Sequence, residues 1–249
     1  MLLSLFSKLF SDKNILDFSV LNADMHSHLL PAIDDGAANI ESSVAMIKGL
    51  QQLGFKKFIT TPHIMPEVYN NSNDIINVAC DELNILIQKE IGTKVEPAAE
   101  YYIDGSFIDR IKNGEKFLTF GDSYILVEVS MMAREKKMEE VLFELKLRGF
   151  KPVLAHVERY PYLFENHKMA HYEQLRDADV FLQVNLRSFT GNYGIIQKKI
   201  ALALAENGMI SFLGTDIHNE TQLSQLKKAM LNKHVQKLLL DGKLLNSQL

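Results

Sequence analysis

The segment Asp24-Met25-His26-Ser27-His28 places two histidines two residues apart, directly after an apolar approach. Side chains of an extended chain repeat every second residue, so His26 and His28 are expected on one side of a strand end. Two carboxylates, Asp34 and Asp35, follow closely, and imidazole with carboxylate is a metal-binding combination. Because pairs of histidines are also common in ordinary turns, the interpretation depends on the rest of the chain.

The composition of the 249 residues is that of an ordinary globular protein, with 47% hydrophobic and 23% charged residues. That length accommodates one α/β domain with a large core. The net charge of −4 lacks the basic excess of a nucleic-acid-binding protein. The single cysteine, Cys80, excludes an internal disulfide and suits a reducing compartment, so a cytoplasmic location is expected. No apolar run approaches the length of an integral membrane segment.

Residues 1–22 are expected to form an N-terminal extension ahead of a domain that spans residues 23–249. The apolar residues of the extension recur at helical spacing around Ser4, Ser7 and Lys8, without the uninterrupted apolar stretch of a signal peptide. A short amphipathic helix of this kind can touch a membrane surface. The favoured expectation is that it packs on the domain.

Apolar segments of strand length alternate with segments of helical periodicity along the chain. Helical structure is expected at residues 40–53, 73–91, 106–112, 136–148, 172–177 and 195–206, with one more helix at the C-terminus. Strands are expected at the opening motif and at residues 55–61, 94–99, 124–129, 151–155, 180–184 and 209–213. Mostly apolar strands between helices predict a parallel sheet covered on its outer face. Because no Gly-rich nucleotide-binding fingerprint follows a strand, a single-domain barrel is favoured over a doubly wound sheet.

Polar side chains stand where the expected strands end. In chain order they are His26, His28, His63, Glu100, Glu128, His156, Asn185, Asp216 and His218. The ends of parallel barrel strands meet at one rim, where active sites form. Each residue alone has an ordinary explanation, such as a salt-bridged carboxylate or a turn histidine. Together they indicate metal, because a cluster of acids without cations would repel itself.

The donor set holds nitrogen and oxygen only, which favours Mn, Fe, Zn or Mg in a catalytic role over a cysteine-type structural zinc site. It exceeds what one ion needs, so two or three ions that share carboxylates are expected, as is typical of phosphoester hydrolysis. A cysteine-dependent phosphatase mechanism does not fit. Its C-x5-R loop would need an arginine where Leu86 follows Cys80.

The order of these motifs resembles the PHP (polymerase and histidinol phosphatase) superfamily. The series is D-M-H-S-H, T-P-H, A-E-Y-Y, V-E-V-S, A-H-V-E-R-Y and T-D-I-H, from about Asp24 to His218. More narrowly, H-S-H-L-L-P-A-I-D-D-G-A and A-H-V-E-R-Y resemble bacterial manganese-dependent protein-tyrosine phosphatases of the CpsB/CapC type, which are associated with capsule and exopolysaccharide synthesis. The resemblance implies a distorted (β/α)7 barrel, PHP/TIM-like, with a site for three manganese ions.

The resemblance also implies a set of metal ligands, called here the predicted ligand set. It consists of His26, His28, Asp35, His63, Glu100, Glu128, His156, Asp216 and His218. Glu100 is expected to bridge ions. Arg159, His63 and Asp216 are the predicted catalytic residues, and Arg159 matches the family arginine that holds the substrate phosphate.

One departure from the family pattern concerns phosphate binding. The resemblance leads us to expect a second arginine shortly after the D-x-H motif, but residues 219–226 contain none. Lys227 or Lys228 is considered as a replacement. Arg187, just past Asn185, is a further predicted substrate contact.

The implied function is hydrolysis of protein phosphotyrosine by a metal-dependent phosphomonoesterase that uses a metal-bound hydroxide, with Arg159 stabilising charge on the phosphate. The implied substrate is the tyrosine-rich tail of a membrane-associated bacterial tyrosine kinase, and a homo-oligomer is compatible with the sequence. Two alternatives stay open. One is a phosphatase for a small phosphate ester such as histidinol phosphate, and the other is a non-catalytic metal-binding scaffold in polysaccharide assembly.

Overall fold

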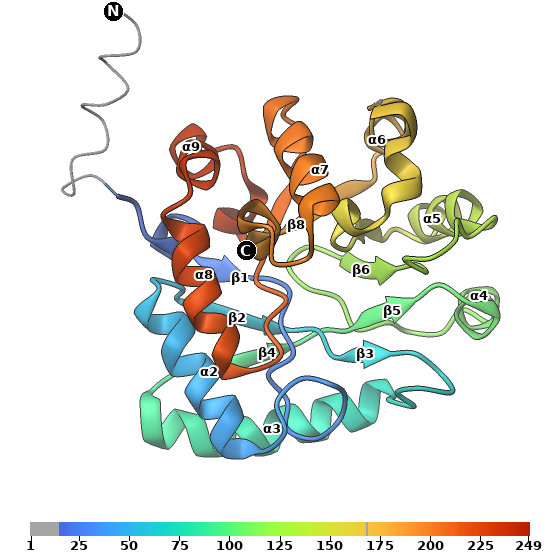
Figure 1. Ribbon diagram of the computed structural model, residues 1–249. Coiled ribbons are helices and arrows are strands. Elements are labelled where there is room, and N and C mark those ends of the chain that lie inside the picture. Colours follow the sequence, from blue (N-terminus) through green and yellow to red (C-terminus); the bar gives the residue numbers. More distant parts are fainter. Residues whose placement is uncertain (1–14, 168) are drawn as a thin grey trace, which may run out of the picture.

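The structure, a computed structural model, describes residues 15–167 and 169–249 (Figure 1). Most of the amphipathic helix expected within residues 1–22 therefore lies outside the described residues. From residue 15 onward, the extension contains a 3-10 turn at Phe18–Val20. The ring of Phe18 stacks on that of Phe55 with centroids 5.0 Å apart, and both side chains are buried.

The strands of the described chain are all parallel and fall into two hydrogen-bonded groups. The first group contains β1 (Ala23–Asp24), β2 (Lys57–Thr60) and β4 (Val95–Pro97). The second contains β3 (His63–Ile64), β5 (Glu100–Tyr102), β6 (Tyr124–Glu128), β7 (Lys151–Leu154), β8 (Phe181–Asn185) and β9 (Phe212–Gly214).

The two groups belong to one curled sheet because two barrel strands are interrupted. β2 continues into β3 after Thr61-Pro62, and β4 continues into β5 after Ala98-Ala99. The neighbours stay paired across both breaks, since Ala98 N donates to the carbonyl of Thr60 at 2.8 Å and Glu100 N to that of Pro62 at 3.1 Å. The strand expected at residues 55–61 is thus shorter than predicted and is followed by a second segment.

The last strand returns to the first. Asp216 N donates to the carbonyl of His26 at 2.8 Å, and His28 N donates to that of Ile217 at 3.0 Å. With β2–β3 and β4–β5 each counted once, the described chain forms a ring of seven parallel barrel strands. The predicted distorted (β/α)7 barrel in a single domain is confirmed.

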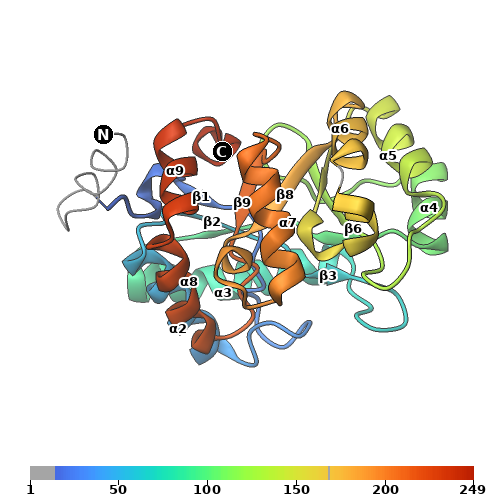
Figure 2. The ribbon, with the colours of Figure 1, turned by 45° about the horizontal axis from the view of Figure 1, so that its top comes forward.

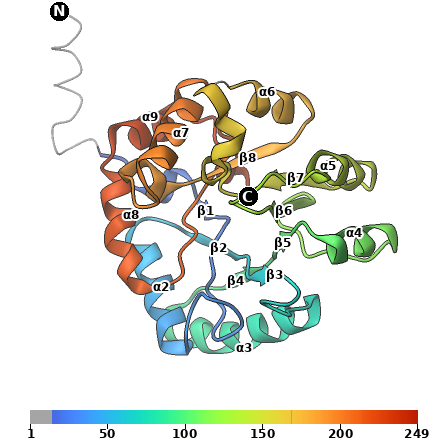
Figure 3. The same cartoon turned by 45° about the vertical axis from the view of Figure 1, so that its right-hand side comes forward.

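Helices surround the strands, as Figure 3 shows. They are α2 (Ile40–Gln52), α3 (Asn73–Ile91), α4 (Gly105–Lys112), α5 (Met138–Leu147), α6 (Ala170–Asp177), α7 (Ile195–Glu206), α8 (Leu223–Met230) and α9 (Lys233–Asp241). The expectation of one C-terminal helix is wrong, because the side chain of Asn232 accepts a hydrogen bond from His234 N and starts α9 as a separate helix. None of the described helices is long and apolar enough to cross a membrane.

The C-terminal helices cover the beginning of the described chain (Figure 2). The side chain of Gln236 on α9 donates to the carbonyl of Leu16 at 2.8 Å and accepts from its N–H at 2.9 Å. This pair of bonds fixes where the chain enters the barrel.

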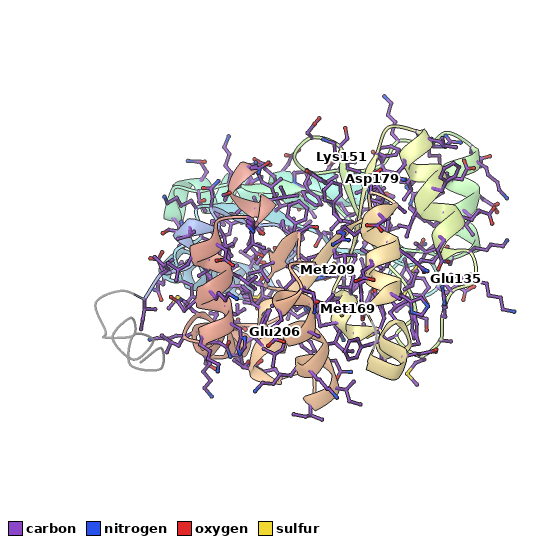
Figure 4. The ribbon with its side chains drawn as sticks, turned by 90° about the horizontal axis from the view of Figure 1, so that it is seen from above. Glu135, Lys151, Met169, Asp179, Glu206 and Met209 are labelled. Atoms are coloured by element: carbon purple, nitrogen blue, oxygen red, sulfur yellow. The ribbon has the colours of Figure 1, made fainter. Side chains whose placement is uncertain are left out.

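Side chains along each barrel strand alternate between the interior and the helix layer. On β6, Leu126 belongs to the cluster inside the barrel, whereas Ile125 and Val127 belong to the larger core under the helices. Rings of Phe120, Tyr124 and Phe212 fill the interior where the strands begin, with centroids 5.1 to 6.0 Å apart. In Figure 4, Lys151 at the start of β7 and Asp179 just before β8 mark that end of the barrel.

Candidate metal centre

The predicted ligand set comes together at the opposite end, where the strands finish, around a pocket of about 400 Å³. Six members line the pocket: Asp35, His63, Glu128, His156, Asp216 and His218. The other three, His26, His28 and Glu100, are fully buried beside them. Residues between positions 26 and 218 of the chain thus meet in one place, as the sequence predicts, while their role as metal ligands stays a prediction.

The carboxylate of Glu100 lies among histidines from three other barrel strands. Its Oε2 is 3.1 Å from His26 Nε2 and 3.4 Å from His28 Nε2, and its Oε1 is 2.9 Å from His156 Nε2. His63 Nδ1 lies 3.3 Å from Oε2. A carboxylate whose two oxygens face different imidazoles has the arrangement that a bridging ligand requires.

Several buried nitrogen and oxygen atoms of this cluster, all of them possible metal ligands, make no hydrogen bond with the described residues. They are His28 Nε2, His63 Nδ1, Glu100 Oε1, Glu128 Oε1 and His156 Nδ1. Some are close to each other, such as His63 Nδ1 and Glu128 Oε1 at 2.9 Å, but they are not aligned as hydrogen bonds. Buried polar atoms are normally satisfied, and divalent cations would satisfy these. The residues present therefore fit metal ions.

Ligand atoms gather in three overlapping groups, each within 4.8 Å: His28, Asp35, His63 and His218; His26, His28 and Glu100; and His63, Glu100 and Glu128. Because His28, His63 and Glu100 each belong to two groups, neighbouring ions would share ligands. This overlap is compatible with a multi-ion site.

The charges in the cluster balance each other strongly. Burial disfavours the imidazolium of His26, but the carboxylates of Glu100 and Asp216 outweigh that effect and raise its pKa to about 10. Burial also disfavours the Glu100 carboxylate, yet His26 and His63 hold its pKa well below the usual value. The site therefore favours ionised carboxylates and positive charge between them, which protons or metal cations can supply.

The backbone is strained at two members of the predicted ligand set. His156 and Asp216, each just beyond a strand, have φ of 32° and 49°, in the left-handed region. Such conformations cost about 1–3 kcal/mol each and concentrate at functional sites. Gly214 allows close approach nearby, since a Cβ there would lie 2.7 Å from Gln183 Nε2 and 2.8 Å from His26 Cβ.

The family model for capsular polysaccharide synthesis proteins, CpsB/CapC, matches residues 22–240, which cover nearly all of this barrel. The chain belongs to the CpsB/CapC family.

Relatives of this CpsB/CapC chain include named phosphatases. Tyrosine-protein phosphatase YwqE from Bacillus subtilis is 32% identical over 79% of this chain and 77% of its own length. A putative tyrosine-protein phosphatase CapC from Staphylococcus aureus is 25% identical over 84% of this chain and 82% of its own length. A solved structure described as YwqE from B. subtilis and CpsB from Streptococcus pneumoniae, "unique metal-dependent tyrosine phosphatases", has a TM-score of 0.74 and 29% identity, covering 91% of this chain and 94% of its own.

In this CpsB/CapC chain, the two neighbouring aspartates have separate positions. Asp35 Oδ1 lies 3.5 Å from Nε2 of both His63 and His218. Asp34 instead accepts from His28 Nδ1 at 2.7 Å and from Gly36 N at 2.9 Å. Sequence reasoning singled out Asp35 and did not assign this orienting contact to Asp34.

Gln183 on β8 is a supporting residue that sequence reasoning missed. Its Oε1 accepts from the backbone N of His156 at 2.7 Å and lies 3.0 Å from His26 Nδ1. Because an amide oxygen only accepts, His26 carries a proton on Nδ1 and turns Nε2 toward the cluster. The Gln183 amide nitrogen donates to Asn185 Oδ1 at 2.9 Å. The signal was available, since Gln183 is two residues before Asn185 and so shares its inward face.

Arg159 and Arg187 differ in how many bonds to the protein already occupy their guanidinium groups. Arg159 lines the pocket with its side chain 25% exposed, and its NH1 lies 3.5 Å from Asp216 Oδ2. Arg187 also lines the pocket, but its NH2 donates to the carbonyl of Asp216 at 2.8 Å and its NH1 lies 3.4 Å from Gln225 Oε1. Lys227 and Lys228 are exposed on α8 and do not belong to the described lining of the pocket.

Proposed function

We propose that this protein is a metal-dependent phosphomonoesterase that hydrolyses phosphotyrosine in proteins. The observation that carries the proposal is the convergence of the predicted ligand set beside the partly exposed guanidinium of Arg159. Several buried atoms of that set have no hydrogen-bond partner in the described part of the chain. The names of the relatives support the same activity.

The proposed cofactor is manganese, as three ions held by the predicted ligand set, with Fe, Zn or Mg as other ions that suit nitrogen and oxygen donors. The overlap of the three donor groups supports more than one ion. When bound, such ions lower the pKa of coordinated water toward neutrality and so supply the nucleophile for phosphorus.

The residues that line the pocket would bind and orient the phosphate. Arg159 offers a charged, partly exposed guanidinium to the phosphate oxygens, where positive charge stabilises the transition state. Arg187 is the proposed second contact, through its Nε, which is buried without a hydrogen-bond partner among the described residues. His63 and Asp216, the other proposed catalytic residues, would hold ions at the lining of the pocket.

A phosphotyrosine substrate suits this chemistry because the tyrosine phenolate, with a parent pKa of about 10, leaves more readily than an aliphatic alkoxide. We propose the tail of a membrane-associated bacterial tyrosine kinase as the physiological substrate and capsule or exopolysaccharide synthesis as the process. The family description supports the process. A cytoplasmic location is proposed from the lone, free and buried Cys80, with residues 1–22 as an extension to the 23–249 domain.

The test compares protein stripped with EDTA and protein reloaded with Mn²⁺ on three substrates: a phosphotyrosyl peptide, a phosphoseryl peptide and histidinol phosphate. We expect EDTA to abolish turnover, Mn²⁺ to restore it, and the phosphotyrosyl peptide to be the preferred substrate. Metal analysis by ICP-MS gives the number of ions per chain.

His156→Ala is the matching active-site variant, and His234→Ala on α9 is its control. We expect the first to lose turnover and the second to keep it. Metal-independent turnover, or full activity of His156→Ala, would overturn the proposal. Preference for histidinol phosphate would instead select the small-ester alternative.

A further inference from the structure

Tyr193 lies at the pocket wall, between the 3-10 turn Leu186–Thr190 and α7, and joins several site residues. Its hydroxyl is 3.0 Å from Asp216 Oδ2 and 3.2 Å from Asn185 Nδ2, and it contacts Arg187 NH2. Amide and guanidinium N–H groups only donate, and an ionised carboxylate only accepts. The phenol therefore accepts from Asn185 and Arg187 and donates its own proton to Asp216.

That donation determines how the Asp216 carboxylate is turned. Its Oδ2 accepts from Asn185 Nδ2 at 2.6 Å and from Tyr193, and Arg159 NH1 lies 3.5 Å away. Its Oδ1 faces three histidines at 3.5 to 3.6 Å: His26, His28 and His218. With one oxygen held by donors, the other is presented to the centre of the cluster in a single orientation.

The ring of Tyr193 makes a separate contact with the arginines. The guanidinium carbon of Arg159 lies over the ring at 4.7 Å from its centroid, and that of Arg187 at 4.8 Å. The negative face of an aromatic ring attracts such cations. The ring thus holds two like-charged groups at one wall of the pocket, although they repel each other.

We propose that Tyr193 is a positioning residue with two separable effects. Its hydroxyl turns Asp216 toward the ions, and its ring holds Arg159 and Arg187 where the substrate phosphate binds. The inference rests on the proposed phosphatase function and deepens it. The hydroxyl acts on the predicted metal ligand Asp216, whereas the ring acts on the two arginines. Loss of the hydroxyl and loss of the ring should therefore have different consequences.

Tyr193→Phe removes the hydroxyl and keeps the ring. We expect Mn²⁺ affinity, measured by calorimetry on EDTA-stripped protein, to weaken about 10–100-fold, the range for groups that support a metal ligand. Turnover of a phosphotyrosyl peptide should show a lower kcat at an almost unchanged KM. Although Arg187 loses its bond to the hydroxyl, both arginines keep their contact with the ring, and Arg187 keeps its bond to the carbonyl of Asp216.

Tyr193→Leu removes the ring as well. We expect the same loss of Mn²⁺ affinity and, in addition, a rise in KM of about tenfold, because the arginines lose the attraction of the ring. Binding of inorganic phosphate to the Mn²⁺-loaded protein should weaken to the same extent, whereas Tyr193→Phe should bind phosphate as the unaltered protein does.

Tyr124→Phe is the matched control, since Tyr124 is half-buried at the other end of β6 from Glu128. It should leave all three measurements unchanged. If Tyr193→Phe binds Mn²⁺ as tightly as Tyr124→Phe does, the proposed role of the hydroxyl is wrong. If Tyr193→Leu binds phosphate as the unaltered protein does, the proposed role of the ring is wrong. Both readouts are independent of turnover, so an inactive wild-type protein would refute the proposed function and leave this test intact.

Discussion

The two ends of the barrel interior are built from the same strands but contain opposite chemistry. Where the strands begin, the rings of Tyr124, Phe181 and Phe212 pack against one another at 5.1 to 6.2 Å. Where they finish, the inward positions hold Glu128 and Asn185. β6 passes from Tyr124 through Leu126 to Glu128 on one face, so a single strand contributes to both ends.

The comparison indicates that one end of each strand contributes to stability and the other end to the candidate site. Burial of aromatic rings supplies stability where the strands begin. Where they finish, buried imidazole and carboxylate atoms that have no hydrogen-bond partner among the described residues oppose folding. The barrel tolerates the destabilising polar cluster because the packed aromatic rings stabilise its other end. Variants at the two ends should therefore affect different measurements.

Glu100→Gln is expected to have the largest effect. It keeps the shape of the side chain but removes the negative charge among four histidines, so Mn²⁺ binding and turnover should each fall by more than about 100-fold, the upper range for groups that only support a ligand. Calorimetry and steady-state kinetics measure both. Glu96→Gln is the control, because Glu96 is exposed on β4 of the same interrupted barrel strand. Equal behaviour of the two variants would contradict the assignment of Glu100.

Phe212→Ala should instead act on stability. It removes a fully buried ring from the aromatic end, so the free energy of unfolding in urea should fall by about 3–5 kcal/mol. The turnover of the folded fraction should stay close to that of the unaltered protein. Phe143→Ala on α5, where the side chain is 55% exposed, provides the control and should change stability little. A selective loss of turnover in Phe212→Ala would break the division between the two ends.

Metal binding should weaken as the pH falls. With its pKa raised to about 10, His26 is protonated at neutral pH until a cation displaces the proton. Mn²⁺ affinity should therefore increase with pH between about 6 and 9, by up to about tenfold per unit for each proton released. Calorimetry in buffers of different ionisation enthalpy counts the protons. Affinity that does not change with pH, or proton uptake on binding, would contradict this sign.

Cys80 is expected to show the smallest effect. Burial raises the pKa of its thiol to about 12, so the reactive thiolate is absent near neutral pH. The folded protein should resist iodoacetamide at pH 8, and Cys80→Ala should keep full turnover. Labelling followed by mass spectrometry, with urea-unfolded protein as the reactive control, measures the first. Inactivation that parallels labelling would bring back a thiol mechanism.

Helices were predictable where local signals bounded them. The helix expected at residues 73–91 is α3, which the Ser72 side chain caps at one end and Gly92 in the left-handed conformation closes at the other. The prediction of a single C-terminal helix is wrong because the break at Asn232 depends on one capping contact within a continuous helical pattern. Periodicity does not predict the interruption of β2 after Thr60, because the length of a strand depends on its pairing with neighbouring strands.

The site was predictable as a set of positions but not as a set of contacts. Positions such as His63 and His156 could be placed at strand ends, and they do meet at one pocket, while their role as ligands stays a prediction. The sequence places Arg187 just past the end of a strand, but its bonds to Asp216 and Gln225 depend on the fold. Tyr193 had no signal, because it lies in a loop outside every motif.

The sequence by itself determined the alternation of strands and helices and the residue type at each strand end, because periodicity and motif order are properties of neighbouring residues. Only the tertiary structure decided that Asp34 holds His28 while Asp35 faces His63, and that Tyr193 turns Asp216. Those outcomes depend on the direction of side chains that meet across the barrel. Such directions follow from the curvature of the closed sheet, which no short segment of the chain contains.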